Sequence, residues 1–362
     1  MKVKSVMTVL LALVMVFALA ACGGGSDTGA SAGNSTAGSS TSDESVVDDT
    51  VYTLSFSSSR PLGSTRNIQI EEVLKQKLEE KSNGRLTIQI YENNTLVAQK
   101  ELLEGMAGGT VDMGYLVGTM YAGQFPYSEL FGTPGLVYDG IEGTDKVLDE
   151  FMNAYPDPIY QDFKILVRYS IGQMGLVSVK PVKTIADIKG LSIRSTSSFV
   201  PFYEALGAST MNLSAGEVYE ALKTGVIGAT NTGLAGAGSN KLGEVANSFT
   251  PLPILYGDEL LAMSIKAYNS LPPDLQAVVD EVGEEMKAVE TAFTISEEEA
   301  AIKLMSDSNS DFAVYELSTA DIAKLAEIAA PMLEAKAKEL DAAGLDGTKA
   351  LEWLREHSVK VN

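Results

Sequence analysis

Residues 181–194 read PVKTIADIKGLSIR and contain a complete step from helix to strand. Thr184 and Asp187 have the spacing of a capping box, with aspartate in place of the usual glutamate, which predicts the start of a short helix. Gly190 ends that helix, because glycine favours the position just after a helix. The four residues that follow form a short strand that finishes at Arg194. Such alternation of helix and strand is typical of an α/β protein.

The same alternation extends in both directions from this stretch. Downstream, Ser214 and Glu217 form a second capping box, Gly225 closes its helix, and Val226-Ile227 starts another strand. Upstream, the expected strands are 52–56, 86–90 and 111–117, and the expected helices are 70–78 and 102–106. This β-α-β-α-β order predicts a largely parallel sheet with helices on both faces and, over the whole chain, two α/β lobes.

The last third of the chain has mostly helical patterns. Helix formers dominate from Pro272 to about Ser308, a length greater than that of a typical globular helix. We therefore expect this segment to run across more than one lobe. A final helix is expected to open at Ser318, with Asp321 three residues later.

The composition argues against several classes of protein. The 362 residues favour two domains, and 27 Lys and Arg against 48 Asp and Glu give a net charge of −21, which argues against wrapping nucleic acid. The single cysteine cannot form an internal disulfide. The single histidine, His357, leaves little for a histidine-based triad or metal site. We expect no catalytic residues, no metal and no cofactor.

The N-terminus has the pattern of a secretory signal. Lys2 and Lys4 precede an apolar run, 6–21, which is short for a membrane-spanning helix and ends in small residues. LAAC at 19–22 resembles the lipobox of bacterial lipoproteins, in which the cysteine, here Cys22, is lipidated and becomes the first mature residue. The alternative is a plain signal anchor with an incidental cysteine. Loss of the leader, 1–21, leaves a charge of −23 (25 minus 48).

Residues 22–50 are expected to be a lipidated cysteine followed by a disordered tether. Gly, Ser, Thr and Ala with scattered acids cannot bury enough apolar surface to offset the entropy of ordering. The pattern therefore predicts an extracytoplasmic protein that a lipid anchor alone holds to the bacterial cell membrane.

A series of short motifs resembles a known family. In chain order the motifs are SNGR (82–85), ENNTL (92–96), GTVDM (109–113), PVKT (181–184), DIKGLSIR (187–194), LGA (206–208) and EVYEALKTG (217–225). In this order and spacing, 51–310 resembles the substrate-binding proteins of tripartite ATP-independent periplasmic (TRAP) transporters, of the DctP type.

The resemblance implies an α/β fold of the periplasmic-binding-protein type, a clamshell whose two lobes exchange chain segments. Lobe one would be 51–171 plus 258–297, lobe two 172–257 plus 298–362, and the long helix would span both. Such a protein, expected to be a monomer, captures a small organic acid by lobe closure. It delivers the acid to transporter membrane subunits on other chains and breaks no bond in it.

The resemblance assigns the ligand clamp to Arg194. This residue ends a strand, and open α/β sheets bind ligands at the carboxyl ends of strands. A guanidinium matches a carboxylate with two parallel, charge-assisted hydrogen bonds, and in the family the arginine at this position clamps the ligand carboxylate. The alternative is a structural or solvated arginine.

The other site positions also come from the resemblance. Met174, beside Gln173, holds the place where the family often has a second arginine, so a second carboxylate would have no partner there. Asn231 and Thr232 stand where the family often has Glu-Asn, and either could supply a neutral hydrogen bond. The remaining aligned positions are Ser59, Gln99 and Val117 in the first lobe and Ser197 in the second.

These departures from the family predict the ligand class. Charged groups are replaced by apolar or neutral ones at Met174, Val117 and 231–232, which favours a monocarboxylic acid, such as a 2-oxo or aromatic acid, over succinate-like or sialate-like solutes. The acidic chain repels anions, so the pocket must be locally positive. Arg194 could provide that charge together with the nearby lysines Lys180, Lys183 and Lys189.

Two other functions stay open at this point. A ligand-sensing lipoprotein for a signalling partner would use the same clamshell. A surface hydrolase with paired carboxylates is the second alternative, although the chain has no nucleophile elbow, His-Glu-x-x-His motif or phosphate loop.

Overall fold

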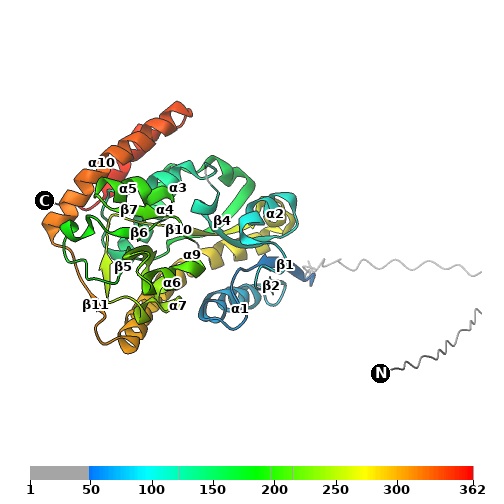
Figure 1. Cartoon of the computed structure of the whole chain (residues 1–362). Helices are drawn as coiled ribbons and strands as arrows, with labels where there is room; N and C mark the ends of the chain where they lie inside the picture. Colours follow the sequence, from blue (N-terminus) through cyan, green and yellow to red (C-terminus); the bar gives the residue numbers. More distant parts are fainter. Residues whose placement is uncertain (1–48, 122, 196, 214, 362) are drawn as a thin grey trace, which may run out of the picture. The chain divides into compact units, whose positions relative to one another are not determined.

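Two separate β-sheets organise the chain (Figure 1). The computed structural model describes residues 49–121, 123–195, 197–213 and 215–361. The expected leader, Cys22 and the tether as far as residue 48 lie outside the described residues. Within the described ranges, no helix is long and apolar enough to cross a membrane.

The first sheet has the strand order β2-β1-β3-β10-β4. Its strands are β1 (Tyr52–Ser57), β2 (Leu86–Tyr91), β3 (Met113–Val117), β4 (Phe163–Ser170) and β10 (Asp258–Ser264). β1 pairs in parallel with β2 and β3, whereas β10 is antiparallel to β3 and β4. Since β10 returns to this sheet after the chain has passed through the second one, the two lobes exchange segments, as the resemblance implied.

The second sheet has the order β11-β9-β5-β8-β6-β7. Its strands are β5 (Met174–Ser178), β6 (Ser192–Arg194), β7 (Ser209–Met211), β8 (Ala229–Gly233), β9 (Ser248–Pro251) and β11 (Ala313–Val314). β6 is parallel to β7 and β8, and β5 is antiparallel to β8 and β9.

Both sheets are mixed, with one antiparallel strand each, and their other described strands all run in one direction, so the expectation of a largely parallel sheet is confirmed. The antiparallel strands are β5 and β10, the strands that follow the crossings at 171–173 and 252–257. Each one starts at the edge where its neighbours end, as the pairing of Asp258 with Ser170 and of Met174 with Gly233 shows. The neighbouring strands consequently direct their carboxyl ends towards the crossing points, where α/β sheets hold ligands.

Helices cover the sheets on both faces. Their bounds are α1 (Glu72–Lys81), α2 (Leu102–Gly108), α3 (Pro126–Phe131), α4 (Gly140–Ala154), α5 (Val200–Ala205), α6 (Val218–Lys223), α7 (Leu234–Ser239), α8 (Ile265–Ser270), α9 (Pro273–Ser308), α10 (Thr319–Ala342) and α11 (Gly347–His357). On the first sheet, α1 and α9 pack against one face and α2 against the other.

The 36-residue helix α9 spans both lobes, which confirms the sequence-based expectation. Val282 and Phe293 pack in the core of the first sheet, and Met305 packs in a core of the second. Gly283 lets α9 lie close to β4, since a Cβ there would be only 3.1 Å from the carbonyl oxygen of Leu166. Figure 1 shows α9, yellow to orange, running from the first sheet to the second.

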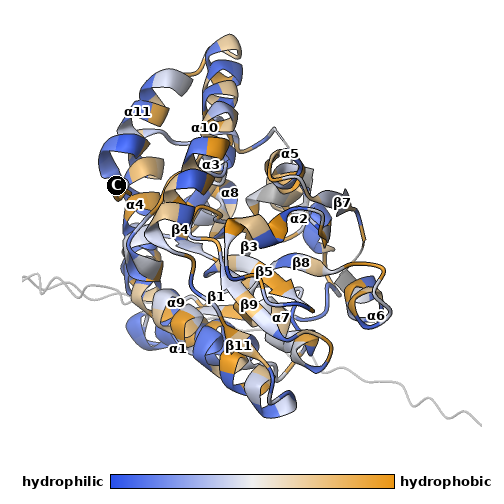
Figure 2. Cartoon of the chain, turned by 60° about the vertical axis from the view of Figure 1, so that its left-hand side comes forward, coloured by the Kyte–Doolittle hydropathy of each residue, from blue (hydrophilic) through white to orange (hydrophobic). Residues whose placement is uncertain are grey.

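A separate helical cluster forms from α3, α4, α10 and α11. Its buried side chains include Phe131, Phe151, Leu333 and Leu354. α10 also contributes Leu325 to a core of the second sheet. Figure 2 shows hydrophobic and hydrophilic residues alternating along α10 and α11, as expected for helices with one buried face.

Local expectations differ from the structure at several points. The segment after Thr184 is a 3-10 helix, Ile185–Ile188, although its capping box is present. The strand expected to start at Val226-Ile227 begins at Ala229, and α11 follows the helix that was expected to be the last. Ser214 of the second expected capping box lies outside the described residues.

Candidate functional site

A cavity of about 640 Å³ lies between the two sheets, and we call it the interlobe cleft. Strands and loops of the first sheet, the middle of α9, and the strand β8 with α7 line it. The lining residues are Arg60, Pro61, Ser64, Thr65, Arg66, Val117, Tyr169, Ile171, Met174, Arg194, Asn231, Thr232, Gly233, Ala235, Gly236, Ser239, Asn240, Glu259, Thr294 and Glu297.

Five of the nine residues aligned with ligand contacts line this cleft: Val117, Met174, Arg194, Asn231 and Thr232. Three of the others line different cavities. Gln173 lines a second cavity beside the crossing points, and Ser59 and Gln99 line a small pocket that shares Arg60 with the cleft. The side chain of Ser197 lies outside the described part of the chain.

Arg194 is the last residue of β6 and is half-buried. Its Nε donates a hydrogen bond to the carbonyl oxygen of Leu213 at 3.0 Å, which fixes the side chain and leaves both terminal NH₂ groups for other partners. Among the described residues, no carboxylate lies within 4.0 Å of its guanidinium nitrogens. Burial lowers the pKa of Arg194 from its ordinary value, because it disfavours the charged guanidinium. A bound anion would stabilise that charged form.

Neutral polar groups surround Arg194 on the second sheet. Asn231 is almost fully buried and donates a hydrogen bond to the carbonyl oxygen of Gly175 at 3.3 Å. Its Oδ1 has no hydrogen-bond partner within the described part of the chain. The neighbouring Thr232 points to the opposite face of β8 and is half-buried. This wall therefore offers one cation and several neutral groups.

The opposite wall contains a buried cation that the sequence did not reveal. Arg66 donates hydrogen bonds to Glu290 Oε2 at 2.8 Å and to the hydroxyl of Tyr169. Tyr169 in turn donates to Glu259, and Tyr115 donates to Glu290 Oε1 at 2.5 Å. Burial lowers the pKa of Arg66, but these four neighbours together raise it well above the ordinary value. The arginine is therefore held as a cation between two carboxylates.

Further charges lie at the surface of the same wall. Arg60 is 3.4 Å from Glu259, and Glu297 projects from α9. Burial raises the pKa of Glu297, and no cation lies within 4.0 Å of its carboxylate in the described part of the chain. The first-lobe wall of the cleft thus carries charges of both signs. The expectation that this side of the cleft offers only apolar or neutral groups to the ligand does not hold.

The lysines expected to make the pocket positive are not part of it. Lys180, Lys183 and Lys189 do not line the cleft, and Lys183 lies over the ring of Tyr315. Arg168 likewise pairs with Asp149, at 3.2 Å, away from the cleft. The positive charges at the cleft are arginines from both lobes. No group of metal-binding side chains occurs among the described residues.

The fold and the cleft define a two-lobed protein built to hold a small molecule between its lobes. The chain belongs to the DctP family, the bacterial extracellular solute-binding proteins of family 7, whose model matches residues 56–339. This confirms the resemblance found in the sequence motifs. The family is one of solute-binding proteins, not of enzymes.

Two curated proteins illustrate the similarity in sequence. A solute-binding protein of Sulfitobacter sp. strain NAS-14.1 is 29% identical over 273 residues, which cover 74% of this chain and 82% of the relative. The 2,3-diketo-L-gulonate-binding periplasmic protein YiaO of Escherichia coli strain K12 is 27% identical over 206 residues, or 55% of this chain and 62% of the relative.

Two solved structures share the fold. A TRAP periplasmic solute-binding protein from Desulfovibrio salexigens, in an open complex, gives a TM-score of 0.77 at 24% identity, over 84% of this chain and 95% of the other. The second is a marine metagenome TRAP solute-binding protein specific for aromatic acid ligands, in complex with 3-hydroxybenzoate. Its TM-score is 0.75 at 23% identity, and the match covers 85% of this chain and 98% of the other.

Proposed function

We propose that this solute-binding protein is the receptor of a TRAP transporter and that it binds a monocarboxylic organic acid in the interlobe cleft. The observation that carries the proposal is Arg194: a half-buried guanidinium at a strand end, with its terminal NH₂ groups free of protein carboxylates among the described residues. A ligand carboxylate would complete its hydrogen bonding. Asn231 and Thr232 would add neutral contacts, and Gln173, Ser59 and Gln99 would lie outside direct reach.

The charges on the first-lobe wall favour one carboxylate over two. Glu297 faces the cleft with no cation within 4.0 Å of its carboxylate among the described residues, and Arg60 and Arg66 act on it only at longer range, so a second ligand carboxylate beside Glu297 would meet a like charge. Val117 and Met174 offer apolar contact instead. Ligands named for structures of the same fold, 3-hydroxybenzoate, benzoate and β-D-galacturonate, each carry a single carboxylate, which agrees with this choice.

Capture would proceed by closure of the two lobes. The cleft is lined from both sheets, so a ligand that bridges Arg194 and the first-lobe wall binds the closed form better than the open one. The bound ligand therefore shifts the population towards the closed form. The closed, loaded form would be the one recognised by the membrane subunits on other chains.

Calorimetry on a matched pair of acids tests the ligand class. After a thermal-shift screen of mono- and dicarboxylates, benzoate and isophthalate provide a pair that differs by one carboxylate. We expect the dicarboxylate of the best pair to bind at least ten-fold more weakly than the monocarboxylate. In Glu297→Gln this difference in affinity should become smaller. Glu299→Gln, on the exposed side of the same helix, is the control and should leave the difference unchanged. Tighter binding of the dicarboxylate to the wild type would refute the monocarboxylate proposal.

We also propose that Cys22 carries a lipid and that the protein is held outside the cytoplasm by this anchor alone. The support is the LAAC stretch that follows the apolar run. Mass spectrometry of the mature N-terminus should find a diacylglycerol adduct in the wild type and none in Cys22→Ala, because only the thiol accepts the lipid. An unmodified Cys22 in the wild type would rule the anchor out.

A further inference from the structure

A second cavity, of about 280 Å³, lies where the chain crosses between the sheets, and we call it the hinge cavity. The sheets are connected by 171–173, by 252–257 and by α9. Each connection contributes a lining residue: Gln173 from the first, Tyr256 from the second and Glu298 from the third. The hinge cavity is thus in contact with every described connection between the two sheets.

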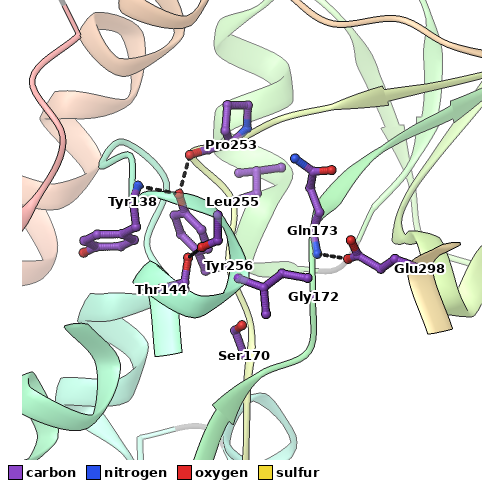
Figure 3. Close-up of a pocket in the computed structure, with 11 residues that line it drawn as sticks. Tyr138, Thr144, Ser170, Gly172, Gln173, Pro253, Leu255, Tyr256 and Glu298 are labelled. Atoms are coloured by element: carbon purple, nitrogen blue, oxygen red, sulfur yellow. Dashed lines mark hydrogen bonds between the residues drawn. The ribbon is translucent and has the colours of Figure 1, made fainter. Parts of the chain in front are cut away.

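One side of the hinge cavity is aromatic. The rings of Tyr138 and Tyr256 lie 5.0 Å apart, and the backbone N–H of Tyr138 donates to the Tyr256 hydroxyl at 2.9 Å. That hydroxyl donates in turn to the carbonyl oxygen of Pro253 at 2.5 Å, so Tyr256 is fixed. Leu255 adds an apolar surface beside the rings. Figure 3 shows the two tyrosines on one side of the cavity and Glu298 on the other.

The opposite side contributes a carboxylate. Glu298 accepts a hydrogen bond from the backbone N–H of Gln173, and no cation lies within 4.0 Å of it among the described residues. A Cβ at Gly172 would overlap this carboxylate, so the glycine is what lets the crossing segment pass so close to it. Burial raises the pKa of Glu298, because it disfavours the charged carboxylate. A cation beside the carboxylate would stabilise the charged form.

A buried polar atom lining the hinge cavity lacks a partner. The hydroxyl of Tyr138 has no hydrogen-bond partner in the described part of the chain, and the residue is 95% buried. Buried hydroxyls are normally satisfied, because an unmade hydrogen bond there is costly. This hydroxyl is therefore consistent with an occupant that can exchange a hydrogen bond with it.

We propose that the hinge cavity is a ligand site, distinct from the interlobe cleft, for a small organic ammonium ion. The carboxylate of Glu298 would bind the ammonium group, and the rings of Tyr138 and Tyr256 would pack on the carbon body, where aromatic faces also attract cations. The volume fits a molecule of several carbon atoms rather than a single water. This site prefers the charge opposite to that of the proposed cleft ligand.

Three consecutive glutamates of α9 provide an internal set of controls. Glu297 lines the interlobe cleft, Glu298 lines the hinge cavity, and Glu299 is exposed. Substitution of each by glutamine removes the same charge in three different surroundings. In Glu298→Gln the amide oxygen can still accept from Gln173, so the hinge hydrogen bond is retained and the fold is expected to persist.

Titration with benzylammonium, followed by NMR and calorimetry on the whole mature chain, tests the proposal. We expect binding with nuclear Overhauser contacts to the rings of Tyr138 and Tyr256, and at least ten-fold weaker binding of the neutral isostere benzyl alcohol. Glu298→Gln should weaken benzylammonium binding at least ten-fold, whereas Glu299→Gln and Arg194→Ala should leave it unchanged.

Two results would overturn the hinge site. One is equal benzylammonium affinity in wild type and Glu298→Gln. The other is a loss of binding in Glu297→Gln but not in Glu298→Gln, which would place the cation in the interlobe cleft. Since the expected outcome does not depend on Arg194, the hinge site and the carboxylate receptor can fail separately.

Discussion

Arg194→Ala is expected to bind the organic acid more weakly by about 2–5 kcal/mol, which is a loss of roughly 30- to several-thousand-fold in affinity. The reason is that closure would leave the ligand carboxylate desolvated and without its partner. Among the described residues, the native side chain is hydrogen-bonded only to Leu213, so little else is lost on truncation. Calorimetry with the acid found by screening gives the measurement.

A second substitution and a matched control make this test specific. Arg194→Lys should recover only part of the affinity, since an ammonium cannot make the planar pair of hydrogen bonds. Lys189→Ala removes a cation that precedes the same strand but does not line the cleft, and it should bind like the wild type. If both Arg194 variants bind as the wild type does, the clamp is not at Arg194.

Arg66→Met is expected to destabilise the protein by about 3–5 kcal/mol, because it leaves the buried carboxylate of Glu290 without its cation and leaves Glu259 with only the partly exposed Arg60. Methionine keeps a long side chain in contact with the surrounding rings, so the charge is the main loss. Denaturant unfolding followed by circular dichroism measures the change. Adding Glu290→Gln should restore part of the stability, because the unpaired carboxylate charge of Glu290 is then removed.

A surface ion pair gives the control for this experiment. Arg355 pairs with Glu334 at 2.6 Å, and both side chains are more than a third exposed. Such pairs contribute about 0–1 kcal/mol, so Arg355→Met should change the stability little. Equal effects of Arg66→Met and Arg355→Met would show that the buried network does not stabilise the fold.

The sequence was sufficient to predict those features of the fold that depend on local patterns of residues. The strand that ends at Arg194, the long helix α9 and the alternation of strands and helices follow from periodicity, caps and glycines, whereas β4, β5, β7, β9, β10 and β11 were not among the expected strands. It was also sufficient to identify the family, because the motifs occur in a fixed order. The family match confirmed that identification and the fold.

The first-lobe wall could not be predicted in the same way. Arg66 and Glu290 form a hydrogen bond although they are 224 positions apart in the sequence, and no periodicity links the two. The direction of β10 is likewise set by where the chain re-enters the first sheet, which no pattern within 258–264 encodes. One available signal was the position of Arg60 and Arg66 after the first strand, at the strand edge where α/β sheets bind ligands.

The exchange of segments between the sheets also constrains the order of folding during synthesis. The first sheet stays incomplete until β10 has been made, because β10 lies between β3 and β4 and pairs with both. Its core also needs the first half of α9, which comes later still. The N-terminal lobe therefore cannot fold as an independent unit while the ribosome is still producing the second sheet. The core of the first sheet can be completed only after about residue 293 has been made, and the second lobe needs Met305, β11 and Leu325, which come later still.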